Sequence, residues 1–253
     1  MSLCVPLTLA EETPPHPGHD PAAFVAWVNT ELAGATATEI LAWAVDTFGD
    51  GLTVACSMQD AVVVDLAASV APGVEVAFLD TGFHFPETLE TARRVVERYE
   101  VTLVTVRAAP GATDRFASGI EDCCAARKVE PLERHLAQRR AWVTGLRRAE
   151  SPSRATARAV EWDAGRQIVK VNPIVGWSDA QVDRYIAERD VVVNPLRERG
   201  YASIGCAPCT APGTGREGRW AGSGRLECGL HPAGTPGASA DVRRRPELRL
   251  RAL

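Results

Sequence analysis

Short apolar segments alternate with helical segments through the middle of the chain, and this alternation constrains the fold more than any other feature. Four apolar segments have the length and the Val, Leu and Ala content of buried strands: Leu52–Cys56, Val74–Leu79, Val101–Val106 and Ala141–Thr144. Two segments with helical periodicity, Ala61–Val70 and Pro86–Tyr99, lie between the first three of these predicted strands. Because strand–helix–strand units run parallel with right-handed crossovers, we predict an α/β fold: a mainly parallel sheet with helices on both faces.

Cap and turn signals predict further elements around this core. They are helices over Ala22–Leu32 and Ile40–Phe48, the second capped by Thr36 and Glu39, a hairpin of Ala159–Trp162 and Ile168–Val171, and a helix from a Ser178/Gln181 cap through Arg189. From Gly200 onward Gly, Pro, Cys and Arg dominate and regular periodicity is lost. An irregular, cysteine-containing C-terminal segment is therefore expected.

Charge and hydropathy exclude two classes of partner. The chain has 28 basic and 32 acidic residues, so no net field attracts nucleic acid or a membrane surface. No apolar run approaches membrane-spanning length. The first 21 residues lack the basic segment and long apolar stretch of a secretory signal. We expect a cytoplasmic protein that binds neither nucleic acid nor membranes.

Ligands of open parallel sheets bind at the carboxyl ends of the strands, and three polar loops follow predicted strands there. The first loop, Cys56–Asp60, offers the Ser57 hydroxyl and backbone N–H groups to a phosphate. An ordinary capped helix start explains the same residues equally well. The loop lacks the Gly-Lys-Ser/Thr of a Walker motif, which argues against hydrolysis of a triphosphate.

The other two loops add a turn and a cluster of arginines. Leu79–Thr88 contains Asp80 beside a glycine turn that would let the backbone approach a ribose or base closely. His84 in this loop is either a site residue or a packed loop histidine. Thr144–Arg154 carries three arginines, including Arg147, whose guanidinium groups suit a sulfate or phosphate better than a solvated charge run.

Four of the seven cysteines form a metal-binding pattern. Cys123 and Cys124 are adjacent, and Cys206 and Cys209 form a CxxC. Together they supply the four thiolates that a [4Fe–4S] cluster or a tetrahedral zinc ion needs. Adjacent cysteines favour the larger cluster, because neighbouring thiolates can bind different irons. A vicinal disulfide or simple buried thiols remain alternatives.

Cys228 differs from these four cysteines. It lies in the segment Glu227-Cys228-Gly229-Leu230-His231, downstream of Arg216, Arg219 and Arg225. Nearby positive charge lowers the pKa of a thiol and favours the thiolate, which is the nucleophilic form. The four-cysteine site needs no fifth ligand, so Cys228 is left for nucleophilic or redox chemistry.

Together these motifs resemble the assimilatory sulfonucleotide reductase family, in particular its iron–sulfur branch of adenylyl-sulfate (APS) reductases. The most specific motifs are Cys123-Cys124-x-x-x-Lys128, Gly205-Cys206-Ala207-Pro208-Cys209-Thr210, Arg216-Glu217-Gly218-Arg219-Trp220 and Glu227-Cys228-Gly229-Leu230-His231. The strand-end loops Leu79-Asp80-Thr81-Gly82 and Thr144-Gly145-x-Arg147-Arg148 match as well. The resemblance covers about residues 52–231 and implies an adenine nucleotide alpha hydrolase-like fold.

The resemblance also implies an activity and a set of site residues. The expected reaction is the reduction of adenosine 5′-phosphosulfate to sulfite and AMP, with thioredoxin or a similar dithiol as donor and an S-sulfocysteine intermediate on Cys228. The predicted substrate-binding residues are Ser57, Asp80, Lys128, Arg147, Arg216, Arg219 and His231. One [4Fe–4S] cluster per chain is expected on Cys123, Cys124, Cys206 and Cys209.

Three alternatives compete with this prediction, and the quaternary state, including a homo-oligomer, stays open. They are a 3′-phosphoadenylyl-sulfate or dual-substrate reductase, an ATP pyrophosphatase or sulfur-transfer enzyme on the same fold, and a non-catalytic iron–sulfur or zinc nucleotide-binding protein. We expect one reductase domain over residues 1–231. It comprises a helical part at about 20–50, a nucleotide-binding part at about 51–195, a cluster and catalytic segment at about 196–231, and a basic tail at 232–253.

Overall fold

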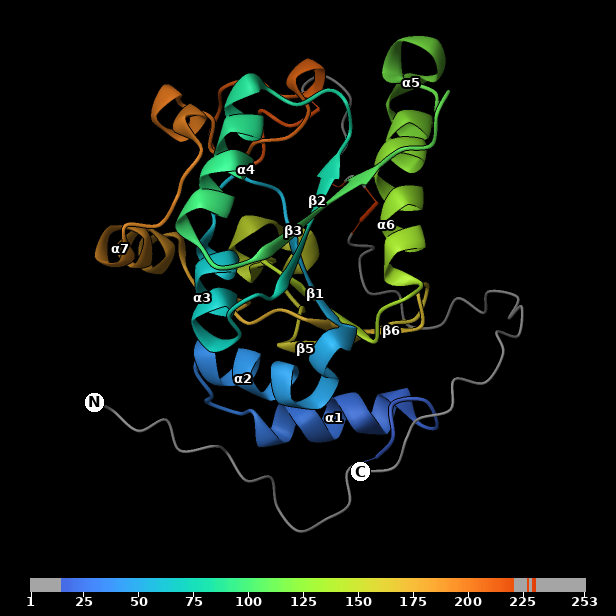
Figure 1. The fold of residues 1–253 in the computed structure, drawn as a ribbon, viewed down its shortest axis with the longest axis vertical. Helices are drawn as coiled ribbons and strands as arrows, with labels where there is room; N and C mark the ends of the chain where they lie inside the picture. The colour runs from blue at the N-terminus through green and yellow to red at the C-terminus, as the bar shows by residue number, and fades with distance from the viewer. Residues whose placement is uncertain (1–14, 221–226, 228, 231–253) are drawn as a thin grey trace.

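A six-stranded sheet with strand order β3-β2-β1-β4-β6-β5 lies at the centre of the molecule (Figure 1). The computed structural model describes residues 15–220, 227, 229 and 230. The strands are β1 (Leu52–Cys56), β2 (Glu75–Asp80), β3 (Thr102–Arg107), β4 (Ala141–Thr144), β5 (Val160–Asp163) and β6 (Ile168–Val171). All neighbouring strands pair in parallel except β5, which pairs antiparallel with β6 at one edge. The predicted mainly parallel sheet is confirmed.

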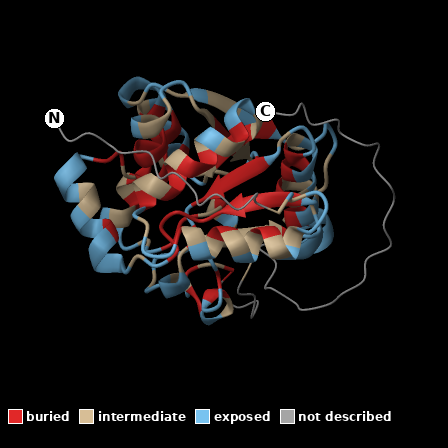
Figure 2. Cartoon of the chain, turned by 90° about the horizontal axis from the view of Figure 1, so that it is seen from below, coloured by how far each residue is buried: buried red, intermediate tan, exposed pale blue. Residues whose placement is uncertain are grey.

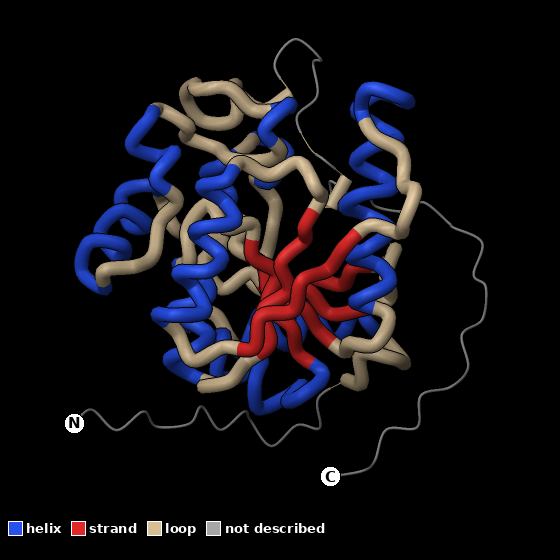
Figure 3. Tube along the Cα trace, turned by 45° about the horizontal axis from the view of Figure 1, so that its top comes forward, coloured by secondary structure: helices blue, strands red, loops and turns tan. Residues whose placement is uncertain are grey.

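Helices pack on both faces of this sheet, as predicted. They are α1 (Pro21–Glu31), α2 (Ala37–Phe48), α3 (Val62–Val70), α4 (Pro86–Arg98), α5 (Arg115–Cys124), α6 (Glu130–Leu136) and α7 (Asp179–Arg189). Helices α3, α4 and α7 lie on one side of the sheet and α5 and α6 on the other (Figures 1 and 3). Strands β4 and β6 are buried throughout and β1 over most of its length, whereas the edge strand β3 is mostly exposed or half-buried (Figure 2).

Alternating side chains on the strands build two apolar cores, one on each face. Ala141 and Val143 of β4 belong to the larger core, which includes residues of α2, α3 and α4. Trp142, between them, faces the other way and packs with Leu132 and Leu136 of α6. Successive strand residues point to opposite faces of the sheet. A strand whose two faces are both buried therefore has an uninterrupted run of apolar residues in its sequence. This is why β4 could be predicted from composition alone.

Most predicted elements are present with ends shifted by about one residue. The Thr36–Glu39 capping box forms, with the Thr36 N–H donating to Glu39 at 2.7 Å, and the Ser178–Gln181 box caps α7. The sequence analysis did not predict the continuous helical column that is formed by α5, one π-helical turn at Ala125–Val129 and α6. Gly119 inside α5 has a φ of 85°, which interrupts the helical repeat and hides its periodicity in the sequence.

A buried carboxylate joins α3 to α7. Asp65 is 5% exposed and accepts hydrogen bonds from the Tyr185 hydroxyl at 2.5 Å and from Arg189 Nε at 3.0 Å. We expect Tyr185→Phe to lower the free energy of unfolding by about 1–3 kcal/mol, because it removes a donor from a buried acceptor. Urea denaturation measures this, with Tyr201→Phe as the matched control. Equal stabilities of the two variants would contradict the assignment.

Candidate functional site

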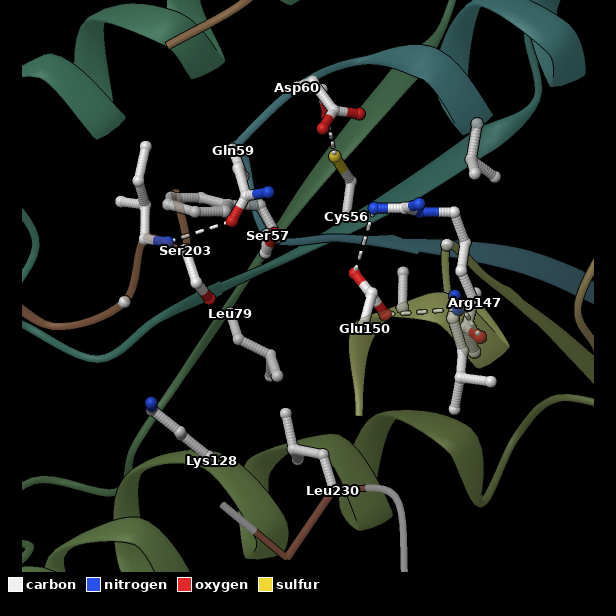
Figure 4. A pocket seen from close by; sticks show the side chains of 18 of the residues that line it. Cys56, Ser57, Gln59, Asp60, Leu79, Lys128, Arg147, Glu150, Ser203 and Leu230 are labelled. Carbon is white, nitrogen blue, oxygen red and sulfur yellow. Dashed lines mark hydrogen bonds and ion pairs between the residues drawn. The ribbon is translucent and has the colours of Figure 1, made fainter. Parts of the chain in front are cut away.

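The carboxyl ends of β1, β2 and β4 open onto a cavity of about 220 Å³ (Figure 4). All three loops singled out in the sequence contribute to its lining. Five of the predicted substrate-binding residues line it: Ser57, Lys128, Arg147, Arg216 and Arg219. The structure thus brings together residues that are up to 162 positions apart (57 to 219). Their individual roles stay predictions. Cys228 and His231 lie outside the described residues.

The first loop is held by the chain that follows α7. The Asn194 N–H donates to the Gln59 carbonyl at 3.1 Å, and the Asn194 side chain donates to the Met58 carbonyl at 3.1 Å. The Ile204 N–H donates to the Gln59 side chain at 2.9 Å. Helix α3 begins only at Val62, so Ser57 does not cap it. Ser57 instead lies in a loop that these hydrogen bonds brace, where it lines the cavity, and its contact with a phosphate stays a prediction.

Two titratable groups that sequence analysis did not assign lie in this loop. Burial raises the pKa of the Cys56 thiol to about 12, and its sulfur contacts the Met58 N–H at 3.4 Å and the Asp60 carbonyl at 3.5 Å. Burial also raises the pKa of Asp60. Cys56 is thus a neutral thiol near pH 7 and a poor nucleophile, although it lines the cavity.

The second loop forms a tight turn with Gly82 at a φ of 77°. The Asp80 carboxylate accepts from the Gly82 N–H at 3.0 Å and pairs with Arg107 at 3.1 Å, and Asp80 is not among the cavity-lining residues. Its neighbour Thr81 does line the cavity, so a direct contact of Asp80 with substrate stays a prediction. The His84 ring also lines it, with Nε2 2.8 Å from the Leu79 carbonyl. Burial lowers the pKa of His84, which favours a neutral, packed ring.

The third loop contributes two arginines that are already paired with carboxylates. Arg147 donates to Asp179 at 2.7 Å, and its backbone N–H donates to Glu150 at 3.1 Å. Arg154 is 8% exposed and forms ion pairs with Glu150 and Glu227. Arg148, which the sequence grouped with them, donates instead to the Ala157 carbonyl at 3.0 Å. The loop is an arginine–carboxylate network rather than a bare cluster of cations.

Lys128 is a buried cation on the opposite side of the cavity from Asp60 (Figure 4). It lies in the π-helical turn between α5 and α6, and such turns are frequent at functional sites. Its exposed fraction is 9%, and within the described part of the chain no carboxylate lies at ion-pair distance from it. A buried ammonium group without a counter-ion favours an anionic ligand.

Arg219 is fixed by close packing. A Cβ added to Gly205 would lie 2.6 Å from the Arg219 guanidinium, so a side chain there would displace the guanidinium. The guanidinium donates to the Ile204 carbonyl at 3.0 Å and lies 4.5 Å from the centre of the Trp220 ring. Arg216 lies 5.6 Å from the same ring. Both arginines are thus held at the cavity by an aromatic platform.

A second, much smaller cavity adjoins the first, and the four clustered cysteines all line it: Cys123, Cys124, Cys206 and Cys209. None of the four forms a disulfide, so the vicinal disulfide alternative is not supported. Three cations, Arg115, Arg127 and Lys128, also line this cavity, and Lys128 and Cys206 line both cavities.

Arg115, Arg127 and Lys128 give the second cavity positive charge, which suits a group bound through thiolates. Burial raises the pKa of the Cys123 thiol, and Cys206 raises it further. Arg115 lies 3.4 Å from the Cys209 sulfur, and the Thr81 hydroxyl lies 3.3 Å from the Cys206 sulfur. Among the described residues, no three His, Cys, Asp or Glu side chains are grouped closely enough to hold a single metal ion.

Two glutamates to which the sequence analysis gave no role, Glu150 and Glu227, belong to the network around the cavity. Glu150 and Arg154 line the cavity, and Glu227 bonds both Arg154 and Arg216. The only signal in the sequence was the presence of Glu150 and Arg154 in the third loop. The pairing of Arg154 with Glu227, 73 positions away, has no local pattern.

Residues 51–212 match the model of the phosphoadenosine phosphosulfate reductase domain. The chain belongs to this family. Proteins named adenosine 5′-phosphosulfate reductase from Rhodococcus erythropolis and Streptomyces coelicolor are each 48% identical to it, with 79% of this chain and 90% of the relative aligned. The reductase of the same name from Mycobacterium tuberculosis is 47% identical, over 79% of this chain and 91% of its own.

Solved structures agree with the phosphoadenosine phosphosulfate reductase fold. A Candida auris phosphoadenylyl-sulfate reductase, solved as a phosphate complex, has a TM-score of 0.64 at 27% identity, covering 75% of this chain and 97% of its own. The FMN adenylyltransferase of Candida glabrata has a TM-score of 0.55 at 15% identity, covering 74% and 66%, and shows likeness of fold alone. Across the described residues, no helix has the length and apolar character needed to cross a membrane.

Proposed function

We propose that the chain reduces adenosine 5′-phosphosulfate to sulfite and AMP in sulfate assimilation, with Cys228 as the nucleophile. The observation that carries the proposal is the gathering of Ser57, Lys128, Arg147, Arg216 and Arg219 around one cavity beside the cavity of the four cysteines. The names of the relatives, which align over most of their length, support the same substrate.

The chain's own residues supply the binding of an anionic substrate. Lys128, Arg216 and Arg219 would pair with the oxygens of the phosphosulfate, for which the guanidinium forks and the buried ammonium are suited. These cations would stabilise the negative charge that develops on the leaving phosphate. Ser57 and Arg147, on loops that follow β1 and β4, would hold the nucleotide.

The proposed first step is attack by the Cys228 thiolate on the sulfur of the bound phosphosulfate. A sulfur–sulfur bond forms, the bond between sulfur and the bridging oxygen breaks, and AMP leaves with that electron pair. A thiolate of thioredoxin, or of a similar dithiol, then attacks the Cys228 sulfur and releases sulfite. The second thiol of the donor resolves the mixed disulfide, which regenerates Cys228 and oxidises the donor.

Cys123, Cys124, Cys206 and Cys209 would hold one [4Fe–4S] cluster per chain. Four thiolates around one zinc ion lie about 3.8 Å apart, whereas a four-iron cluster spaces them more widely. The surrounding Arg115, Arg127 and Lys128 would balance the charge of four thiolates. When bound, the cluster would order this part of the site and shape the field at Lys128.

Sulfite release with thioredoxin, measured in parallel on adenosine 5′-phosphosulfate and its 3′-phosphorylated analogue, tests the substrate. We expect clearly faster turnover of adenosine 5′-phosphosulfate. The likeness to the Candida auris enzyme makes the 3′-phosphorylated compound the second candidate. Preference for that compound would reverse the substrate assignment, and no sulfite from either would remove the proposed activity.

A further inference from the structure

Glu227 is anchored by a fork of hydrogen bonds from Arg154. Its two carboxylate oxygens accept from Arg154 Nε at 2.8 Å and Nη2 at 2.9 Å. The Ser153 hydroxyl donates to the same carboxylate at 3.3 Å, and Arg216 Nη2 donates at 3.2 Å. The Glu227 side chain is 17% exposed and that of Arg154 is 8% exposed. Bidentate pairs of this kind are among the strongest charge-assisted contacts.

Arg154 is committed to this contact and not to a ligand. Its third nitrogen, Nη1, pairs with Glu150, so all three guanidinium nitrogens meet carboxylates of the chain. Burial alone would raise the pKa of Glu227, but the hydrogen bonds from Arg154 hold it below its ordinary value. Glu227 therefore stays ionised near neutral pH and the pair persists.

A second anchor lies just beyond Cys228 in the sequence. Leu230 lines the main cavity and packs against the apolar cluster that contains Leu132 and Trp142 (Figure 4). Its carbonyl accepts from Arg166 Nη1 at 3.3 Å, and Arg166 is itself paired with Asp163 at 2.7 Å. Glu227, directly before Cys228 in the sequence, is thus held by an ion pair, and Leu230, two positions after Cys228, is held by apolar packing.

We propose that Glu227 is a positioning residue of the reaction: its pair with Arg154 fixes the backbone next to Cys228 and orients Arg216. The inference rests on the proposed function, because it assumes that Cys228 attacks the substrate. Cys228 is bonded directly to Glu227, so a loose Glu227 lets the nucleophile move relative to the cavity. Displacements of about 1 Å at a reacting group cost on the order of 10²-fold in rate.

The test is single-turnover labelling of Cys228, followed by intact-protein mass spectrometry with substrate and no reductant. We expect Glu227→Gln to slow the addition of the SO3 group by about 10²-fold, because the amide cannot accept from both arms of the guanidinium fork. Binding of AMP, measured by calorimetry, should stay within about threefold. Glu217→Gln is the matched control, an exposed glutamate of the same segment, and should label at the wild-type rate.

A double-mutant cycle separates positioning from general damage to the fold. Arg154→Lys keeps the charge but loses the fork, so we expect it to reproduce the slow labelling. The double variant Glu227→Gln/Arg154→Lys should be no slower than the worse single variant, because both changes break the same link. Additive losses, or weakened AMP binding in step with the slow labelling, would assign Glu227 a merely structural role.

The outcomes distinguish this inference from the proposed function. If wild-type protein labels and Glu227→Gln labels equally fast, the positioning role is wrong and the proposed function stands. If wild-type protein never gains an SO3 group, the proposed function itself fails. Leu230→Ala provides a second test with the ion pair intact, and we expect it to slow labelling through loss of the apolar anchor.

Discussion

Cys228→Ser is expected to abolish sulfite formation, with a loss of roughly 10⁴-fold or more, as for other enzymes that lose their nucleophile. A serine hydroxyl near neutral pH is not ionised, and it cannot form the sulfur–sulfur bond that a dithiol later cleaves. The measurement is sulfite release with thioredoxin, together with mass spectrometry of the variant after exposure to substrate. No SO3 adduct should appear on the variant.

Nucleotide binding and the bound iron serve as controls for the Cys228→Ser variant. AMP affinity, colour and iron content should remain at wild-type values, because Cys123, Cys124, Cys206 and Cys209 already supply the four thiolates that the proposed cluster needs. Full activity in Cys228→Ser would remove the assigned nucleophile. Transfer of that role to Cys56 is disfavoured by its environment, since burial raises the pKa of the Cys56 thiol to about 12.

Cys209→Ser is expected to remove most of the bound iron. Protein purified without oxygen should be brown and contain about four irons per chain, and loss of one thiolate from a four-cysteine site should leave the cluster unstable. Cys209 is less buried than the other three cysteines, so this substitution disturbs the apolar packing least. Iron analysis and the visible absorption spectrum measure the effect.

Cys56→Ser is the matched control for iron content, because Cys56 lines the main cavity and not the cavity of the four cysteines. It should retain the iron and colour of the wild-type protein. A colourless wild-type protein that contains zinc would reject the iron–sulfur assignment. Equal iron in Cys209→Ser and wild type would show that the ligand set is different.

The cationic side chains that line the main cavity differ in whether they pair with a carboxylate of the chain. Arg147 and Arg154 meet carboxylates of the chain, whereas Lys128 meets none at ion-pair distance within the described residues. An uncompensated buried cation keeps its attraction for an incoming anion, while paired arginines hold the surrounding loops in place. Arg147 and Arg216 do both, because each lines the cavity and pairs with a carboxylate of the chain.

The sequence by itself determined the sheet and the cysteine pattern. Segments such as Leu52–Cys56 and Ala141–Thr144 are apolar throughout because both of their faces are buried, and that signal is local. The capping boxes at Thr36 and Ser178 are equally local, since donor and acceptor lie three positions apart. The family motifs could be found for the same reason.

Only the tertiary structure decided which of these motifs meet. The π-helical turn that buries Lys128 between the two cavities has no periodic signature, because it departs from the 3.6-residue repeat that sequence patterns reveal. The pairing of Arg154 with Glu227 joins residues 73 positions apart. Contacts of this kind depend on how loops at the strand ends pack in space, so no pattern of neighbouring residues in the sequence reveals them.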